Sequence, residues 1–177
     1  MMKRIQYVSL FLLLILCTGF GQAQQKNMGS PITVKHDEVS GKRRVELEAQ
    51  RISSTLTMSI TAEIDTRTKG ERPLRDFGTA TVNFVSTTSR REYGADDTEF
   101  NFLVDGERVK GGSVSSSPLT DKRAKDGKEL AHGVMSNGAL QDIGRGRDVK
   151  MKISEQVFTL DKSVIENIAA VFRELIK

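Results

Sequence analysis

Residues 55–64 alternate strictly between polar and apolar side chains, and this pattern restricts the fold more than any other feature of the chain. The apolar positions are Leu56, Met58, Ile60, Ala62 and Ile64. A period of two places successive side chains on opposite sides of an extended chain, so the pattern predicts a β-strand with one buried side. The alternate positions are polar, which indicates an antiparallel sheet with its other side in water.

Other segments carry the same signal. Further strands are expected at residues 45–49, 77–87, 100–104, 130–135, 149–153 and 157–160, and polar loops at 65–76 and 115–128. Asp105-Gly106 predicts a two-residue hairpin, because a type I′ turn needs positive φ at both central positions. This turn would place Phe102 opposite Val109 and Phe100 opposite Gly111, with the Phe100 ring over the glycine.

Two helices are expected in the second half of the chain. Residues 137–144 favour a short helix over a strand, with Ser136 as its N-cap and Leu140 and Ile143 turned inward. Residues 161–176 have helical spacing of apolar side chains along one stripe, with Asp161 at the N-cap. Such a stripe typically packs on a sheet, and a membrane-surface or partner-docking helix is the alternative.

The fold class is therefore mainly β: an antiparallel β-sandwich or a curled sheet with these two helices.

The N-terminus has the pattern of a secretory signal peptide. Lys3 and Arg4 precede an apolar run from Val8 to Cys17, and small residues around Ala23 favour cleavage after that position. We expect residues 1–23 to be a signal peptide, 24–31 a flexible linker and 32–177 a single β-rich domain. An uncleaved anchor is one alternative. Lipid attachment at Cys17 is another, which the large Leu16 before it disfavours.

Cleavage changes the composition. Removing residues 1–23 leaves 154 residues, takes away two of the 27 basic residues and lowers the formal charge from +4 to +2. Cys17 is the sole cysteine, so the mature chain would have no disulfide, no thiol nucleophile and no cysteine metal ligand. The nearly balanced charge gives no strong field for nucleic acid, and Tyr93 is the one plausible stacking residue for bases or sugars.

Several polar groups are candidates for a reactive or binding site. His36, within Lys-His-Asp-Glu, suits a metal or a general base, but consecutive residues of a strand point to opposite sides and a solvated cluster is the simpler interpretation. His132 has no recognisable partner. Asp96, Asp97 and Glu99 provide oxygen ligands for Ca²⁺ without EF-hand spacing. Four serines could recruit a distant histidine, but no nucleophile-elbow motif contains them: Ser113, Ser115, Ser116 and Ser117.

Three further patterns have simple structural interpretations. Gly144-Arg145-Gly146-Arg147 is too short for a phosphate loop and predicts a turn between a helix and a strand. A row of hydroxyls suits the wet side of a sheet, although such rows also bind water, glycans or partner strands; its members are Thr55, Thr57, Ser59, Thr61, Thr79 and Thr81. Basic groups at residues 42–44, 90–91 and 122–123 are expected in loops.

Two segments carry a resemblance. FNFLVDGERV at residues 100–109 and DVKMKISEQVFTLDKSVIENIAAVFREL at residues 148–175 are similar to exported, β-rich bacterial proteins with a C-terminal helix. The resemblance implies the same order of elements and supplies no catalytic residues.

Taken alone, the sequence favours an exported, non-enzymatic binding or structural module of the cell envelope, periplasmic or extracellular. No catalytic residue, cofactor or metal site is assigned. The expected partner is another envelope protein or polymer, with no nucleic acid and no transmembrane segment after cleavage. The alternative is a hydrolase whose site forms only in three dimensions.

Overall fold

The computed structural model describes residues 24–26, 30–66, 78–87, 99–118 and 129–177. These residues form ten strands and two helices: β1 (Gln24–Lys26), β2 (Ile32–Asp37), β3 (Lys42–Arg51), β4 (Leu56–Asp65), β5 (Thr79–Ser86), β6 (Glu99–Val104), β7 (Glu107–Pro118), β8 (Glu129–Ser136), α2 (Asn137–Arg145), β9 (Val149–Ile153), β10 (Gln156–Thr159) and α3 (Lys162–Ile176). The strands form one open antiparallel sheet in the order β1-β2-β3-β4-β5-β8-β7-β6-β9-β10.

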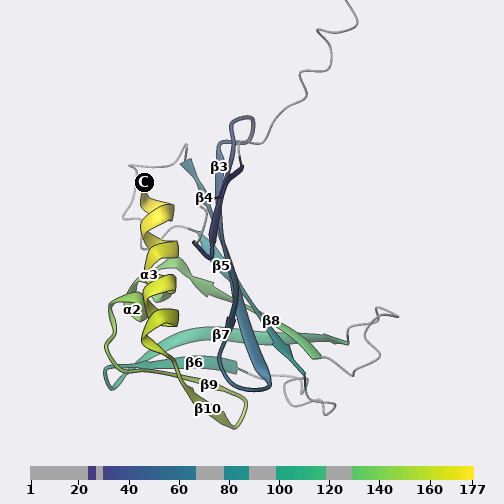
Figure 1. Ribbon diagram of the computed structural model, residues 1–177, viewed down its shortest axis with the longest axis vertical. Coiled ribbons are helices and arrows are strands. Elements are labelled where there is room, and N and C mark those ends of the chain that lie inside the picture. The colour runs from purple at the N-terminus through teal and green to yellow at the C-terminus, as the bar shows by residue number, and fades with distance from the viewer. Residues whose placement is uncertain (1–23, 27–29, 67–77, 88–98, 119–128) are drawn as a thin grey trace, which may run out of the picture.

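The sheet is strongly curled. In Figure 1 strands β3 and β4 run close to the long axis of the molecule, whereas β6, β9 and β10 cross them at a wide angle. Both helices lie on the same side of the sheet (Figure 1): α3 packs on β2, β3 and β4, and α2 contacts β5, β7 and β8. The mainly β fold is confirmed, in its curled-sheet form. No helix of the described segments is long and apolar enough to span a bilayer.

Strand β7 joins the two halves of the sheet. Its first part pairs with β6 and its second part with β8, and the register with β6 shifts between Phe100 and Asn101. This bulge makes Gly112, not Gly111, the partner of Phe100, which corrects the predicted register. The predicted contact with the ring is present, because a Cβ at Gly111 would overlap the Phe100 ring. Glycines at a bulge let a strand bend where another backbone approaches closely.

The core lies between the sheet and the helices. All five apolar positions of β4 are buried, as the alternation predicts. Three rings fill the centre, with centroids 5.4 Å apart for Phe84 and Phe100 and 5.9 Å apart for Phe100 and Phe102, both edge-on. Edge-to-face contacts of this kind add to the stabilisation from burial.

Both predicted helices are present, with one difference at their starts. The Ser136 hydroxyl accepts a hydrogen bond from the Ala139 N–H at 3.1 Å, and Leu140 and Ile143 are fully buried. Asp161 occupies the N-cap position of α3 with extended backbone, but its side chain accepts no capping hydrogen bond. The Asp161 carbonyl accepts from the Val164 and Ile165 amides instead.

Other expectations need correction. The alternation of β3 stops at Leu47, because the register with β4 shifts between Leu47 and Gln50; Ala49 is therefore exposed. Gln50 accepts a hydrogen bond of 2.8 Å from Asn167 on α3.

Residues 115–118, expected in a loop, continue β7, and the short strand β1 lies within the expected linker. The Asp105-Gly106 turn is confirmed, with φ values of 50° and 90°.

Some expectations concern residues that lie outside the described segments: the signal peptide with Cys17, the strand start at Phe77, Tyr93, Asp96, Asp97 and the basic groups at 90–91 and 122–123.

Candidate binding face

The side of the sheet opposite α2 and α3, here called the outer face, carries the alternate side chains of every strand. Three regions of this face bring polar groups together: a row across β4, β5, β8 and β7, an ion-pair network on β2, β3 and β4, and a hollow over β6 and β9.

The row places Ser59, Asn83, His132 and Ser115 side by side on four neighbouring strands. The Ser115 hydroxyl and the His132 Nε2 are 2.7 Å apart and hydrogen-bonded. Sequence reasoning considered both residues and missed the pair, because Ser115 was expected in a loop and the pairing of β7 with β8 has no local signal.

A Ser–His pair can form a nucleophile when the histidine is itself oriented and oxyanion donors are in place. Within the described segments no carboxylate hydrogen-bonds to His132. The pair is exposed on the open sheet. Among the described residues, two of the usual requirements of a serine nucleophile are therefore missing around the pair: an orienting acid and a water-excluding pocket.

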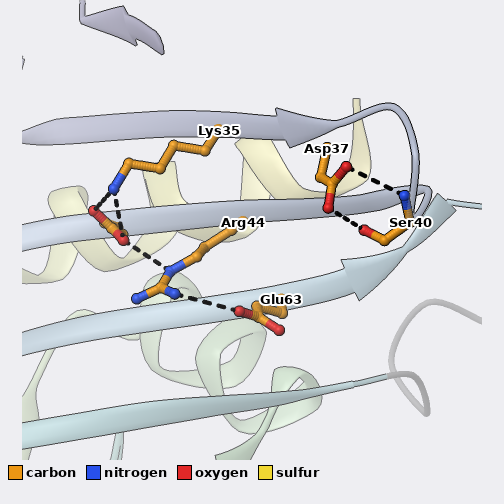
Figure 2. A network of polar contacts seen from close by, with 6 residues as sticks. Lys35, Asp37, Ser40, Arg44 and Glu63 are labelled. Carbon is orange, nitrogen blue, oxygen red and sulfur yellow. Dashed lines mark hydrogen bonds and ion pairs between the residues drawn. The ribbon is translucent and has the colours of Figure 1, made fainter. Parts of the chain in front are cut away.

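His36 lies on β2 opposite Arg43 and is exposed. Its neighbour Asp37 is used locally: the carboxylate accepts hydrogen bonds from the Ser40 hydroxyl at 2.6 Å and from the Ser40 amide (Figure 2). The Val39 amide donates to the same carboxylate at 3.0 Å. The Ser40 hydroxyl is the main reason that the pKa of Asp37 lies below its ordinary value. Asp37 thus stabilises the turn to β3, and the Lys-His-Asp-Glu segment does not converge on one point.

The ion-pair network crosses three strands, as Figure 2 shows. Glu46 on β3 accepts from Lys35 at 3.0 Å and from Arg44 at 2.7 Å, and Arg44 extends to Glu63 on β4 at 3.6 Å. Residues 42–44 were expected in a loop, but they begin β3. On the opposite side of β3, Arg43 pairs with Glu174 of α3 at 3.4 Å. These basic residues are partnered within the domain and hold strands and helix together.

The Gly-Arg-Gly-Arg segment ends α2 and leads into β9, as expected for a turn. Two backbone donors at its end are occupied: the amides of Arg147 and of the following residue, Asp148, donate to Asp105 Oδ1 at 2.9 and 2.8 Å. The bond from the Asp148 amide, followed by that from Arg147, holds the pKa of Asp105 below its ordinary value. A carboxylate thus occupies the position that a bound phosphate would need.

The remaining candidates do not assemble into a site in the described segments. Glu99, from the acidic group considered for Ca²⁺, pairs with Arg108 at 3.6 Å. Within the described part of the chain no three His, Cys, Asp or Glu residues are grouped closely enough to hold a metal ion. Thr57, Ser59 and Thr61 face outward from β4 beside β5, whereas Thr55 precedes the strand.

A hollow of about 710 Å³, here called the β6 hollow, lies on the outer face at the β10 end of the sheet. Its lining includes Asn101, Leu103, Arg108, Lys150, Lys152 and Val157, which come from β6, β7, β9 and β10. Leu103 and Val157 are 42% and 61% exposed, so apolar surface is open to solvent between cationic side chains. Sequence reasoning did not identify this hollow, because its residues come from separate strands.

Asn101 gives the β6 hollow an unusual polar group. In the register of the sheet it lies between Lys110 of β7 and Lys152 of β9. Its Oδ1 atom is buried and has no hydrogen-bond partner. Nearly all buried polar atoms are hydrogen-bonded, so this unpaired acceptor, on a residue that lines the hollow, is an unsatisfied polar group of the candidate site.

Comparison of the chain with protein-family models, with curated protein sequences and with solved structures finds no match.

Proposed function

We propose that this protein is an exported, non-enzymatic binding module of the cell envelope and that the β6 hollow is its binding site. The observation that carries the proposal is the combination of exposed Leu103 and Val157 with the unpartnered Asn101 Oδ1 in one hollow. Binding sites commonly combine open apolar surface with a few polar groups that orient the ligand. Export is the part of the proposal that rests on residues 1–23 of the sequence.

The charges around the hollow support binding by exchange of ion pairs. Arg108, Lys150 and Lys152 are held by carboxylates at 3.6–3.8 Å, and the lysine and arginine side chains are 43–70% exposed. Exposed ion pairs of this length contribute little to folding. An anionic group of a partner can therefore replace these carboxylates at small cost.

Affinity capture from the native envelope tests the proposal when three baits are compared. Protein produced from the full chain is immobilised beside a Leu103→Asp, Val157→Asp double variant and a Val134→Asp variant. Val134 is also exposed on the outer face, but on β8 and away from the hollow lining. We expect one stoichiometric partner on the wild type and on Val134→Asp, and its loss from the double variant. Equal capture by all three baits would contradict the assignment of the hollow.

The hydrolase alternative is favoured by one observation, the 2.7 Å contact between Ser115 and His132. A fluorophosphonate ester reacts with activated serines, and intact mass with peptide mapping locates the adduct. Ser113, exposed on the same face of β7, is the matched control. Adduct on Ser115 of the wild type, lost in His132→Gln and absent from Ser113, would support the hydrolase and overturn the non-enzymatic proposal. Equal labelling of both serines would leave the binding module as the function.

A further inference from the structure

Strand β10 forms one edge of the sheet, and its backbone has a free side. The β9–β10 hairpin pairs Ile153 with Gln156, Lys152 with Val157 and Lys150 with Thr159. At its far end the Leu160 amide donates to the Val149 carbonyl at 2.9 Å. Because bonded and non-bonded pairs alternate in an antiparallel ladder, the N–H and C=O groups of Val157 and Thr159 point away from β9.

No strand of the described segments pairs with this free side of β10. An edge with unpaired backbone groups is a template for another strand unless short length, charge, proline or a covering segment limits pairing. β10 is four residues long, so Val157 and Thr159 are the two residues that it offers to a partner strand. The β10 sequence Gln-Val-Phe-Thr contains neither charge nor proline. Val157, at the centre of the edge, is also part of the β6 hollow.

The side chains next to the edge define what an added strand would carry. On the outer face, Lys150 and Lys152 of β9 lie beside Thr159 and Val157 in the register, and each lysine is held at 3.8 Å by an exposed carboxylate, Asp148 or Glu155. On the other face, Phe158 is partly buried and packs against the core. A strand added to β10 would therefore meet cations on one face and an aromatic ring on the other.

We propose that β10 binds an extended polypeptide segment of a partner by strand addition, and that this segment alternates acidic with apolar residues. Its acidic side chains would face Lys150 and Lys152, and its apolar side chains would continue the surface of Phe158. Recognition of this kind takes affinity from main-chain hydrogen bonds and specificity from alternate side chains. The inference rests on the proposed function, since it names the partner class of the same hollow.

Peptides of defined pattern test the partner chemistry. Fluorescein-labelled EVEVEVEV, KVKVKVKV and the block peptide EEEEVVVV are titrated with protein produced from the full chain, and anisotropy is recorded. We expect binding of the alternating acidic peptide and at least tenfold weaker binding of the other two. Equal binding of the block peptide would overturn strand addition, because that peptide has the same charge without the alternation. Tighter binding of the lysine peptide would overturn the charge assignment.

A proline substitution tests the backbone edge directly. Val157→Pro removes an N–H that points away from β9, so the β9–β10 ladder keeps its hydrogen bonds. Val157→Thr is the matched control, because it retains the N–H and suits a strand. We expect Val157→Pro to abolish peptide binding and Val157→Thr to reduce it less than threefold, with circular dichroism and thermal unfolding confirming that both fold. Retained binding by a folded Val157→Pro protein would overturn the proposal.

Charge reversal and self-association complete the test. Lys150→Glu with Lys152→Glu is expected to weaken binding of EVEVEVEV at least tenfold, whereas Lys162→Glu, on the helix side, leaves it unchanged.

Sedimentation of the protein alone reveals whether a second copy of the chain occupies the edge; a dimer abolished by Val157→Pro would overturn the partner class. Envelope capture lost in Leu103→Asp, Val157→Asp but retained in Val157→Pro would support the proposed function while overturning strand addition.

Discussion

The ring of Phe100 lies directly against the backbone of Gly133, at the place where β7 passes from β6 to β8. A Cβ at Gly133 would overlap ring carbon Cε1 of Phe100. Phe100 also contacts Gly111 in the same way, so one buried ring occupies the space left by two glycines, whereas at Gly112 the Val134 carbonyl blocks a Cβ. The glycines at the bend of the sheet therefore also make room for its central ring.

Gly133→Ala is expected to destabilise the domain by about 1–3 kcal/mol, the usual range for a methyl group forced into a filled core. The backbone of Gly133 does not have positive φ, so the cost comes from the ring and not from backbone strain. Urea unfolding measures the loss. Phe100→Leu in the same chain relieves the overlap, so the double variant should lose less than the sum of the single variants. Additive losses would show that another contact causes the effect.

Stability should depend on the ionisation of Asp105. Its carboxylate accepts the Asp148 and Arg147 amides, and the pKa of Asp105 lies below the ordinary value of 3.8. A lowered pKa stabilises the folded protein above pH 3.8, and this stabilisation is lost as the pH falls from that value through the folded-state pKa. Asp105→Asn should reduce the slope of the free energy of unfolding against pH in this acidic range.

The control for this pH prediction is Asp161→Asn. The Asp161 side chain accepts no capping hydrogen bond. Its replacement removes a carboxylate but no hydrogen bond of this kind, so it provides the reference slope for Asp105→Asn. A slope that Asp105→Asn leaves unchanged would contradict the role given to the two amide bonds.

The two helix starts predict unequal effects of alanine. Ser136→Ala removes the acceptor of the Ala139 amide and should cost about 1 kcal/mol of unfolding free energy, as for other N-caps. Asp161→Ala removes no such bond and should cost less. Chemical denaturation of both variants gives the comparison. Equal losses would mean that the charge of Asp161 at the helix N-terminus stabilises α3 as much as the Ser136 hydrogen bond stabilises α2.

Asn101 should lower stability in the unliganded protein. Its buried Oδ1 lacks a hydrogen-bond partner, and an unsatisfied buried group costs about 1–3 kcal/mol. Asn101→Val introduces a strand-forming side chain without that polar atom and should raise the unfolding free energy by about 1 kcal/mol. The same variant should weaken capture of the envelope partner. A stability loss in Asn101→Val would show that the amide is satisfied in solution and would remove it from the site.

Local patterns predicted much of the fold. The five alternating apolar residues of β4, the Asp105-Gly106 turn and the capped helix after Ser136 all depend on neighbours within a few residues, and each is present. The bulge opposite Phe100 was not predicted, because its register depends on the approach of Val134 and Gly133 from β8. The order of strands was also outside the reach of local patterns, since β5 pairs with β8 and β6 with β9.

The candidate site was not predicted for the same reason. The Ser115–His132 contact and the β6 hollow both combine side chains from strands that are distant in the chain. One signal was present in the sequence. Lys150 and Lys152 alternate with buried residues of β9, and on β7 Arg108 and Lys110 alternate with the partly buried Val109 and the buried Gly111. Cations at every second position of neighbouring strands share one face, but only the pairing shows that Asn101 and Leu103 lie between them.

The position of α3 has a consequence for how the chain matures. Strands β2, β3 and β4 precede α3 in the chain, and α3 packs on their apolar side. Until residues 162–176 have been synthesised, that apolar side lacks its cover. These strands therefore reach their native packing only after the segment that follows β10 is available.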